Sequence, residues 1–334
     1  MSKSRGHGCF GVSDEKFMGP SLFGRIGIFR RLTGIPEVEW AGRKPVARGK
    51  FCLTRSIDIV VSGHRYFDSR ASASPFTMSN PTPRRRLVGL STKMYFSLQR
   101  TRDFTDSFIS KLAAVPQELL SNIDIFIIPD FISLTNTIAQ LESSPVPIWT
   151  GAQDCHWEDQ GAFTGEVSPS VLSSAGVKLV EVGHAERRRI FGEDDAMVAK
   201  KTAAVSRNGM IPLVCIGERT HGDVYAAVDE CRVQVDAIMS SVADEAEVVL
   251  AYEPVWAIGA SQPAGEKHVL DVVSGIRGLD SVKTRTGTTR VLYGGSAGPG
   301  LYEKLKSGLD GLFLGRFGHD PQQFIKTIQE VAEA

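Results

Sequence analysis

The chain has 334 residues, of which 42% are hydrophobic and 23% are charged, fractions that are typical of a globular protein. Its 38 Lys and Arg residues balance its 38 Asp and Glu residues, so net charge gives no reason to expect a nucleic acid or a membrane surface as partner. No apolar run approaches the roughly 18 residues of a membrane-spanning helix. The five cysteines form no Cys-x-x-Cys pair, which favours free thiols in a reducing, cytoplasmic compartment over disulfides or a zinc site.

Residues 1–77 differ in composition from the rest of the chain. They carry 13 Lys and Arg residues against 6 Asp and Glu residues, whereas residues 78–334 carry 25 against 32. They also lack a sustained hydrophobic period. We therefore expect a single folded domain over 78–334, preceded by a disordered leader or by a spurious extension upstream of a true start at Met78. If the segment is instead a transit peptide, for which its acidic residues are unusual, the location would be mitochondrial.

From Leu87 onward, apolar strand-length runs alternate with helix-length stretches. The expected strands cover 87–93, 124–129, 147–153, 177–183, 210–216, 247–252, 290–294 and 311–315. Three of the expected helices cover 133–141, 196–208 and 224–239, with Ser168 and Asp223 as helix N-caps and Gly209 as a C-terminal cap. Eight strands alternating with helices predict an α/β fold of the (β/α)8 barrel type. An open, doubly wound sheet is the alternative, although no Gly-x-Gly-x-x-Gly follows the first strand.

In such a barrel the functional residues follow the carboxyl ends of the strands. Lys93 comes at the end of the first expected strand, His184 after the fourth and Glu253 after the sixth. Glu253 is followed by Pro254 and by an apolar stretch ending in Gly259, which suits a general base that is covered by a flap. His184 opens a helix, whose dipole disfavours the imidazolium and leaves a neutral ring that can polarise a carbonyl group.

Glycines follow the last two expected strands, in Gly294-Gly295-Ser296 and in Gly315-Arg316. Backbone N–H groups at such positions bind phosphate in barrels of this kind. A base, a neutral histidine, a cation and a phosphate site together predict proton transfer between adjacent carbons of a phosphorylated hydroxy-carbonyl compound. This enediolate chemistry needs no metal and no organic cofactor.

At these residues the sequence resembles the triosephosphate isomerase family, over essentially all of 87–334 and in the family's order. The matching runs are Gly161-Ala-Phe-Thr-Gly-Glu-Val-Ser-Pro169, Gly183-His-Ala-Glu-Arg-Arg188, Phe191-Gly-Glu193, Cys215-Ile-Gly-Glu218, Ala251 to Gly259, and Tyr293-Gly-Gly-Ser296. The resemblance implies a TIM barrel with Glu253 as base, His184 as electrophile, Lys93 as the cation and Glu186 as the partner of Lys93. It also implies a flap over 254–263, phosphate contacts from Gly259, Ser296, Gly315 and Arg316, and a homodimer in which the loop around Thr164 inserts into the second subunit.

Several positions depart from the family's usual pattern. Ser91 stands where the family usually has Asn, and Ala185 stands where Ser usually follows the catalytic His. Ala260-Ser261-Gln262 replaces the usual Thr-Gly-Lys, and Gly315-Arg316 replaces Gly-Gly. Ser91, His156-Trp157 and Gly315-Arg316 are similar to relatives that isomerise erythrulose phosphates. The shorter side chain of Ser91 is expected to leave room beside the substrate for a fourth carbon.

The main reading is therefore an isomerase of the triosephosphate isomerase type, which interconverts dihydroxyacetone phosphate and glyceraldehyde 3-phosphate. The alternative is an erythrulose-phosphate isomerase with the same chemistry and a longer substrate. A phosphosugar-binding barrel without catalysis is a third reading, which retention of Lys93, His184 and Glu253 argues against. A Schiff-base aldolase that uses Lys93 is a fourth, supported by the position of that residue alone.

Overall fold

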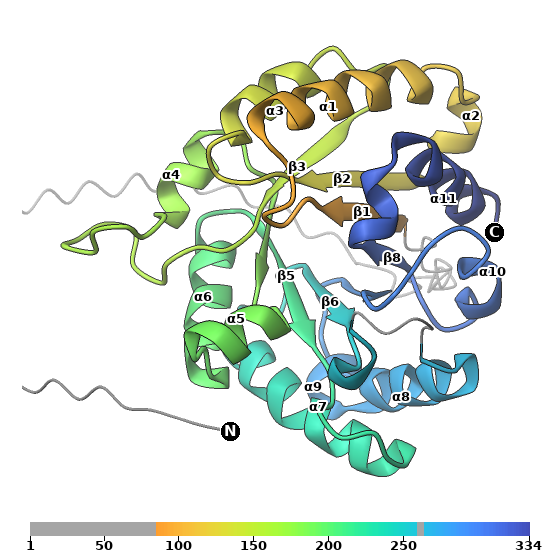
Figure 1. Ribbon diagram of the computed structural model, residues 1–334. Coiled ribbons are helices and arrows are strands. Elements are labelled where there is room, and N and C mark those ends of the chain that lie inside the picture. The colour runs from red at the N-terminus through yellow and green to blue at the C-terminus, as the bar shows by residue number, and fades with distance from the viewer. Residues whose placement is uncertain (1–84, 259–263) are drawn as a thin grey trace, which may run out of the picture. The chain divides into compact units, whose positions relative to one another are not determined.

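The computed structural model describes residues 85–258 and 264–334 of the chain (Figure 1). The predictions for residues 1–77, for Gly259 and for the distal part of the flap lie outside the described residues.

Eight parallel strands form a closed barrel, in which each strand pairs with its neighbour in sequence and β8 pairs with β1. The strands are β1 (Arg86–Ser91), β2 (Ile123–Ile128), β3 (Ile148–Ala152), β4 (Leu179–Val182), β5 (Ile211–Ile216), β6 (Val248–Tyr252), β7 (Thr289–Tyr293) and β8 (Gly311–Leu314). The predicted (β/α)8 barrel is confirmed. The open, doubly wound sheet is wrong, because a ladder from Leu87–Gly311 to Leu90–Leu314 closes the sheet on itself.

Each predicted strand overlaps an observed one, and most predicted strands run one or two residues too far at their carboxyl ends. Parallel strands covered on both faces are apolar throughout, which is why they could be found in the sequence. Their ends are less clear, because the chain turns out of the ladder where it begins to carry functional side chains. Lys93, for example, lies two residues beyond the end of β1 at Ser91.

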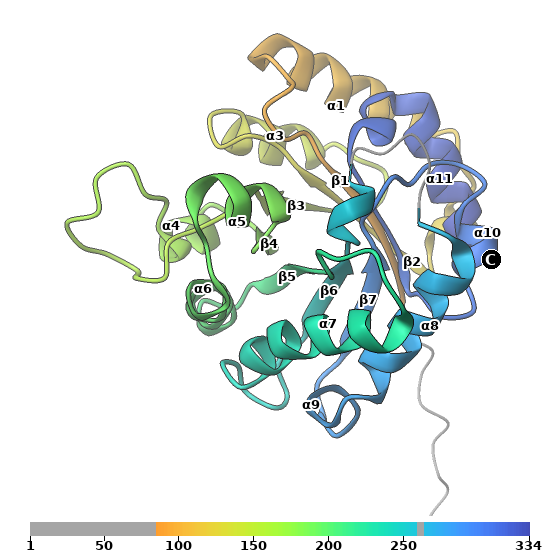
Figure 2. The ribbon, with the colours of Figure 1, turned by 60° about the horizontal axis from the view of Figure 1, so that its bottom comes forward.

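The helices lie around the outside of the strands (Figures 1 and 2). They are α1 (Leu98–Leu112), α2 (Gln117–Leu120), α3 (Leu134–Leu141), α4 (Pro169–Ser174), α5 (Ala185–Phe191), α6 (Asp195–Arg207), α7 (Val224–Met239), α8 (Glu266–Gly278), α9 (Asp280–Lys283), α10 (Tyr302–Leu305) and α11 (Pro321–Glu333), with 3-10 turns η1 (Val255–Ala257) and η2 (Arg316–His319). Both predicted N-caps are confirmed, since Ser168 and Asp223 accept hydrogen bonds from the first turns of α4 and α7. Gly209 follows α6 with a left-handed φ of 72°.

The interior of the barrel is filled by apolar side chains that point inward from the strands. These are Leu87, Phe126, Ile128, Leu179, Ile211, Leu213, Cys215, Val249, Ala251, Leu292 and Phe313. The fit is close enough that a Cβ at Gly89 would lie 2.3 Å from the ring of Phe126. A second, larger core lies between the strands and the helices. Because the interior is filled, the barrel offers space for a ligand only at its ends.

The amino-terminal end of the barrel is closed by buried charges. Arg290, at the start of β7 and 3% exposed, pairs with Asp124 at 2.6 Å and also with Glu247. Both carboxylates pair with the terminal nitrogens of this buried guanidinium, which is a structural arrangement. The chemistry is thus expected at the opposite end, where the strands finish.

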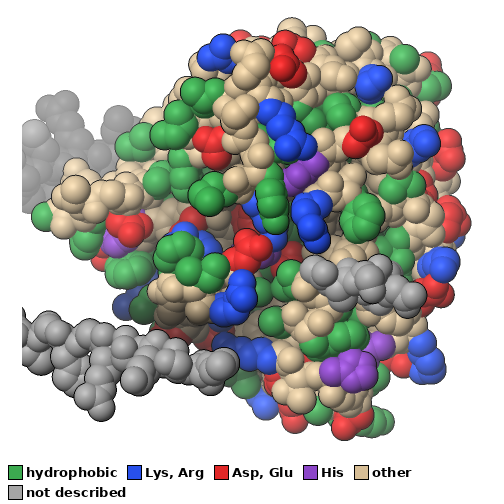
Figure 3. All heavy atoms as spheres, in the orientation of Figure 1, with side chains coloured by type: hydrophobic (Ala, Val, Ile, Leu, Met, Phe, Trp, Pro, Cys, Tyr) green, Lys and Arg blue, Asp and Glu red, His purple; other side chains and the backbone are tan. Residues whose placement is uncertain are grey.

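None of the helices in the described ranges is long and apolar enough to cross a membrane. On the face shown in Figure 3, Lys and Arg side chains are interspersed with Asp and Glu side chains. The mixed surface agrees with the balanced charge of the sequence.

Candidate functional site

Lys93 lies just beyond β1 in a left-handed backbone conformation, with φ of 48°. This conformation is unfavourable for a residue other than glycine and persists where surrounding contacts hold it. One such contact comes from the side-chain amide of Gln153, which donates to the Lys93 carbonyl oxygen at 2.9 Å. The Lys93 amine donates to Glu186 Oε1 at 2.9 Å and lies 3.3 Å from His184 Nε2. The structure thus brings the predicted pair of Lys93 and Glu186 into direct contact.

The Lys93 amine is held in its cationic form. Burial lowers the pKa of Lys93, but the hydrogen bond to Glu186 and the charges of Glu253, Glu186 and Glu181 outweigh burial and raise the pKa above its usual value. One amine therefore faces three carboxyl groups, from β4, from α5 and from the end of β6.

His184 is the N-cap of α5, and its Nδ1 accepts a hydrogen bond from the backbone N–H of Glu186 at 3.1 Å. A neutral ring with Nδ1 as acceptor carries its hydrogen on Nε2. Burial and then the charge of Lys93 lower the pKa of His184 to about 4, although Glu186 opposes them. The ring is therefore neutral near pH 7, as the sequence predicts, with burial as the larger cause.

Glu253 is the first residue after β6, and its backbone N–H donates to the carbonyl oxygen of Ile216 at 2.8 Å. Its carboxylate is 4% exposed and places Oε2 at 3.4 Å from His184 Nε2. Burial raises the pKa of Glu253 to about 8; the charge of Lys93 opposes this rise, whereas Glu181 and Glu186 add to it. Among the described residues, Glu253 Oε2 has no hydrogen-bond partner, so it is a buried acceptor that is available to a ligand.

Two glycines make room for Glu253. A Cβ at Gly294, just after β7, would lie 2.4 Å from Glu253 Oε1. A Cβ at Gly217, just after β5, would lie 2.0 Å from the Glu253 carbonyl oxygen. Any larger residue at either position would displace the carboxylate or its backbone. Gly294 was expected to help bind phosphate, and the structure gives it this second role.

These residues border a pocket of about 220 Å³ at the carboxyl ends of the strands. The predicted site residues on its wall are Ser91, Lys93, His184, Glu186, Glu253, Ser296, Gly315 and Arg316. Gly295 also lines it, so the glycines after β7 and β8 lie on the same pocket as the titratable groups. Arg316 is exposed at the start of η2. Predicted site residue Gly259 lies outside the described residues.

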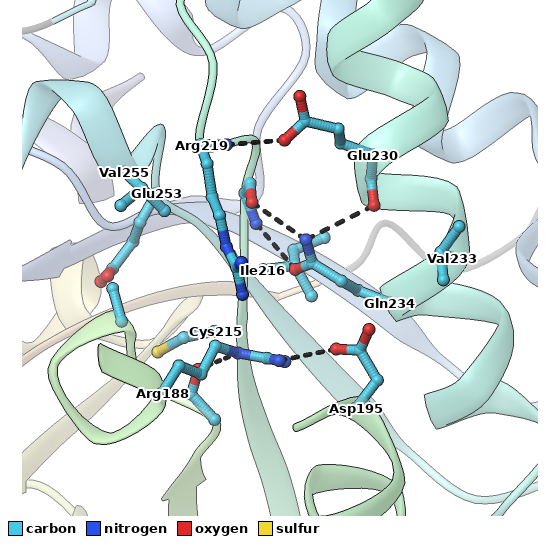
Figure 4. A pocket seen from close by; sticks show the side chains of 13 residues that line it. Arg188, Asp195, Cys215, Ile216, Arg219, Glu230, Val233, Gln234, Glu253 and Val255 are labelled. Atoms are coloured by element: carbon cyan, nitrogen blue, oxygen red, sulfur yellow. Dashed lines mark hydrogen bonds and ion pairs between the residues drawn. The ribbon is translucent and has the colours of Figure 1, made fainter. Parts of the chain in front are cut away.

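Glu253 also lines a second, neighbouring cavity of about 300 Å³, which is shown in Figure 4. There the side chain of Gln234, on α7, makes paired hydrogen bonds to the backbone of Gly217, at 3.1 and 3.0 Å. Arg188 pairs with Asp195 at 2.6 Å. The Gln234 contacts hold the segment at Gly217 on which the backbone of Glu253 packs.

The described part of the predicted flap is anchored through Glu218, a carboxylate with no exposed surface. Trp256, in η1, donates from Nε1 to Glu218 Oε1 at 2.9 Å, and Tyr252 donates from its hydroxyl at 3.2 Å. His268 Nε2, on α8, lies 3.0 Å from the same oxygen. The root of the flap is therefore tied to the residue that ends the motif Cys215-Ile-Gly-Glu218.

Thr164 lies away from this pocket. It belongs to the segment between β3 and α4, which projects from the barrel in both ribbon views (Figures 1 and 2). His156 stacks on Trp157 and lies against Phe163 in a tilted arrangement within this segment, with ring centroids 4.2 Å apart in both pairs. Phe163 nevertheless remains 42% exposed.

A family model described as triosephosphate isomerase matches residues 86–331. The chain belongs to the triosephosphate isomerase family. It is 42% identical to the L-erythrulose-1-phosphate isomerase of Pectobacterium atrosepticum, over 74% of this chain and 96% of that protein. It is 37% identical to the L-erythrulose-1-phosphate isomerase of Rhizobium meliloti, over 74% and 97%. It is 35% identical to the triosephosphate isomerase of Aquifex aeolicus, over 73% and 98%. The chain is thus an isomerase of this family, which acts on phosphosugars.

Four side chains that the sequence patterns do not single out border the site of this isomerase. Tyr95 and Phe317 line the pocket, and His319 Nε2 lies 2.9 Å from the carbonyl oxygen of Ser91. Glu181 is buried in β4 and acts electrostatically on both Lys93 and Glu253. A sequence signal existed for Glu181 alone, since it is a carboxylate between two valines in an apolar strand.

No group of three or more His, Cys, Asp and Glu side chains within 85–258 and 264–334 is arranged to hold a metal ion.

Gly294→Ala should leave the barrel folded and lower kcat by about 100-fold, because the added methyl group would displace the Glu253 carboxylate from its position. The matched control is Gly278→Ala, since a Cβ there would meet nothing within 4 Å. Circular dichroism checks the fold and a steady-state isomerase assay measures kcat. Turnover of Gly294→Ala equal to that of Gly278→Ala would contradict the role given to Gly294.

Proposed function

We propose that this chain interconverts erythrulose phosphates by enediolate proton transfer, with Glu253 as the base, His184 as a neutral hydrogen-bond donor and Lys93 as the cation. The observation that carries the choice of substrate is Ser91, a short polar side chain on the pocket wall beside Lys93, where the family usually has Asn. Four L-erythrulose-1-phosphate isomerases among the relatives, at 42, 37, 38 and 37% identity, support the same choice.

Glu253 is suited to remove a proton from carbon. A carboxylate with a raised pKa is a stronger base than an exposed one, and it remains partly ionised near neutral pH. Its unpaired Oε2 is the atom that would take the proton. After the transfer, the same carboxyl group returns the proton to the adjacent carbon, so that the base is regenerated.

His184 would stabilise the oxyanion of the enediolate through its Nε2–H. Because Nδ1 is already occupied by the N–H of Glu186, the hydrogen on Nε2 is the one that remains for the substrate. Lys93 would balance the charge of the enediolate and of the phosphate group, and Glu186 would keep its amine in place.

The phosphate group would bind to backbone N–H groups after β7 and β8, at Ser296, Gly315 and Arg316. Gly295 is required there by the adjacent Tyr293, since a Cβ at Gly295 would lie 2.4 Å from the Tyr293 hydroxyl oxygen. The absence of a side chain at Gly295 and Gly315 leaves room for an anion close to the main chain. The contact from Gly259 and closure of the flap belong to the same proposal.

The chemistry of L-erythrulose 1-phosphate determines what one enediolate step can yield. Its carbonyl group is on the second carbon and its phosphate is on the first, so the proton to be removed is on the third carbon. If that proton returns to the second carbon, and the hydroxyl proton on the third carbon passes to the oxygen of the second, the carbonyl group moves to the third carbon. The expected product is therefore another ketose phosphate, whereas the same step on dihydroxyacetone phosphate yields an aldehyde.

Isomerisation of triose phosphates is the second candidate, because Lys93, His184 and Glu253 would serve it equally well and relatives such as the Aquifex aeolicus protein carry that name. We do not favour a barrel without catalysis, since such a barrel has no need of a neutral histidine beside a buried, unpaired carboxylate.

The substrate proposal is tested by kcat/KM for L-erythrulose 1-phosphate and for dihydroxyacetone phosphate, measured side by side on the full chain. We expect at least about a tenfold preference for the tetrulose phosphate, since even one added methylene that fits a pocket is worth factors of about 10 to 200. Ser91→Asn should narrow this preference by filling the space. If the unmodified chain prefers the triose phosphate, the proposed substrate is wrong and isomerisation of triose phosphates is the better assignment.

We also propose a homodimer, in which the segment around Thr164 inserts into a second subunit. Its support is the projection of this segment from the barrel and the exposure of Phe163 within it. Sedimentation velocity should give a particle of about twice the 36.3 kDa chain, and Thr164→Arg should shift it toward the monomer. A single-chain mass at micromolar concentration for the unmodified protein would refute the dimer.

A further inference from the structure

Lys93 follows a strand end that is held by neighbouring segments. It lies two residues after the end of β1 at Ser91, and its backbone is left-handed, with φ of 48°. The N–H of Thr92 donates to the carbonyl oxygen of Ile128, at the end of β2, at 2.9 Å. The side chain of Gln153, which follows β3, donates to the Lys93 carbonyl oxygen at 2.9 Å. These contacts hold the strand end from the side of β2 and β3.

The opposite side of this strand end faces β8. In a strand, the backbone groups of alternate residues turn toward opposite neighbours. The N–H of Leu87 donates to the carbonyl oxygen of Asp310, just before β8, at 2.9 Å, so the carbonyl group of Ser91, four residues further on, faces the same side. The ladder ends where Leu314 pairs with Leu90, and the chain then turns into η2. The Ser91 carbonyl group therefore lies just beyond the last pair of the ladder.

His319, the last residue of η2, donates to this carbonyl group. Its Nε2 lies 2.9 Å from the Ser91 carbonyl oxygen, and Nε2 is the donor because a carbonyl oxygen can only accept. The rings of Tyr95 and Phe96 pack edge-on against the imidazole, with centroids at 5.6 and 4.8 Å. Both rings follow Lys93 in the chain, so His319 contacts the segment on either side of that residue.

His319 acts as a neutral donor and not as a further cation. Burial lowers the pKa of His319, and the hydrogen bond with Ser91 opposes this change. The charges of Arg100, Lys93 and Arg316 lower the pKa further. The ring is therefore neutral near pH 7 and adds no positive charge for a phosphate group. Its contribution is to the position of the backbone that it holds.

The turn that carries His319 is the one at which phosphate is proposed to bind. Gly315 and Arg316 line the pocket, and η2 begins at Arg316. The N–H of Gly318 donates to the Gly315 carbonyl oxygen at 2.9 Å, which closes the turn. A Cβ at Gly318 would lie 3.1 Å from the Cβ of Leu90, so the turn packs directly on β1. The phosphate-binding turn and the end of β1 thus form one packed unit, in which His319 makes a directional contact.

We propose that His319 is a positioning residue, which fixes the place of Lys93 by holding the Ser91 carbonyl group to the phosphate-binding turn. Without this hydrogen bond a carbonyl group in a buried residue would lose its partner, and the left-handed backbone at Lys93 would lose a support. The Lys93 amine would then meet His184 and the substrate from a different place. This inference rests on the proposed role of Lys93, and it holds for a triose or a tetrulose substrate alike.

The test is the steady-state kinetics of His319→Leu and His319→Gln, with whichever of the two substrates the unmodified chain turns over faster. His319→Leu keeps an apolar side chain against Tyr95 and Phe96 but removes the donor. We expect kcat to fall by at least about tenfold, since displacement of a reacting group by about 1 Å can cost about 100-fold in rate. Glutamine can present an N–H group near the position of Nε2, so His319→Gln should restore most of kcat.

Tyr302→Phe is the matched control. The Tyr302 hydroxyl group is buried and donates to the carbonyl oxygen of Leu309 at 3.0 Å, and neither residue lines the pocket. This variant also deprives a carbonyl group of its side-chain donor, so it should lower the melting temperature and leave kcat nearly unchanged. Melting temperatures identify variants that fail to fold. If His319→Leu is one of them, His319→Phe takes its place, since it keeps a ring but not the donor.

The outcomes separate this inference from the function on which it rests. If Lys93→Ala is as active as the unmodified chain, the role of Lys93 in the proposed function is wrong, and the inference is wrong with it. If Lys93→Ala is inactive while His319→Leu has the kcat of Tyr302→Phe, or while His319→Gln restores no activity, the positioning role alone is wrong. A higher KM with unchanged kcat in His319→Leu would mean that His319 serves only the phosphate-binding turn, which would also overturn the inference.

Discussion

The site depends on one amine that is shared by several carboxyl groups, of which Glu253 and Glu181 are buried. Lys93 donates to Glu186 at 2.9 Å, and it also acts electrostatically on Glu253 and Glu181. Burial favours the neutral form of each carboxyl group. Lys93 limits that effect at Glu253 and Glu181 without cancelling it, whereas at Glu186 its hydrogen bond and charge help to lower the pKa below the usual value. As a result Glu253 remains a strong base, while the same positive charge helps to keep His184 neutral. Removal of Lys93 would therefore alter the protonation of all its neighbours, in addition to removing a group that is proposed to contact substrate.

Glycines at three positions in the barrel make room for this arrangement. Gly294 and Gly217 clear the space that the Glu253 side chain and backbone occupy, and Gly89 clears the interior for Phe126. The interior is otherwise filled, and Arg290 closes the amino-terminal end with its own carboxylate partners. The ionisable groups at the carboxyl ends of the strands thus lie on a packed interior. This packing explains how the left-handed backbone at Lys93 can be maintained.

Much of the architecture could be predicted from the sequence, because strands buried on both faces are apolar throughout and helix caps have a chemical signature. Lys93, His184 and Glu253 could be selected because each ends or follows a predicted strand, where barrels carry their chemistry. Other features depend on contacts between distant segments. The left-handed backbone at Lys93 is supported by Gln153 on the third strand's loop, and the clearance at Gly294 has meaning only beside Glu253. The inward direction of Glu181 could not be predicted either, since the phase of alternation in a four-residue strand is not evident without the sheet.

The central claim is that Glu253 acts as a buried base whose pKa neighbouring carboxyl groups help to raise. The most direct measurement is the pH dependence of kcat/KM in the unmodified enzyme and in Glu181→Gln. A base must be ionised to act, so a raised pKa moves the loss of activity on acidification to a pH well above the ordinary value of 4.5. Removal of the Glu181 charge should shift this limb to lower pH, and titration of the substrate phosphate, near pH ~6, is common to both enzymes and cancels in the comparison. Superimposable profiles, or a limb near 4.5 in the unmodified enzyme, would contradict the account.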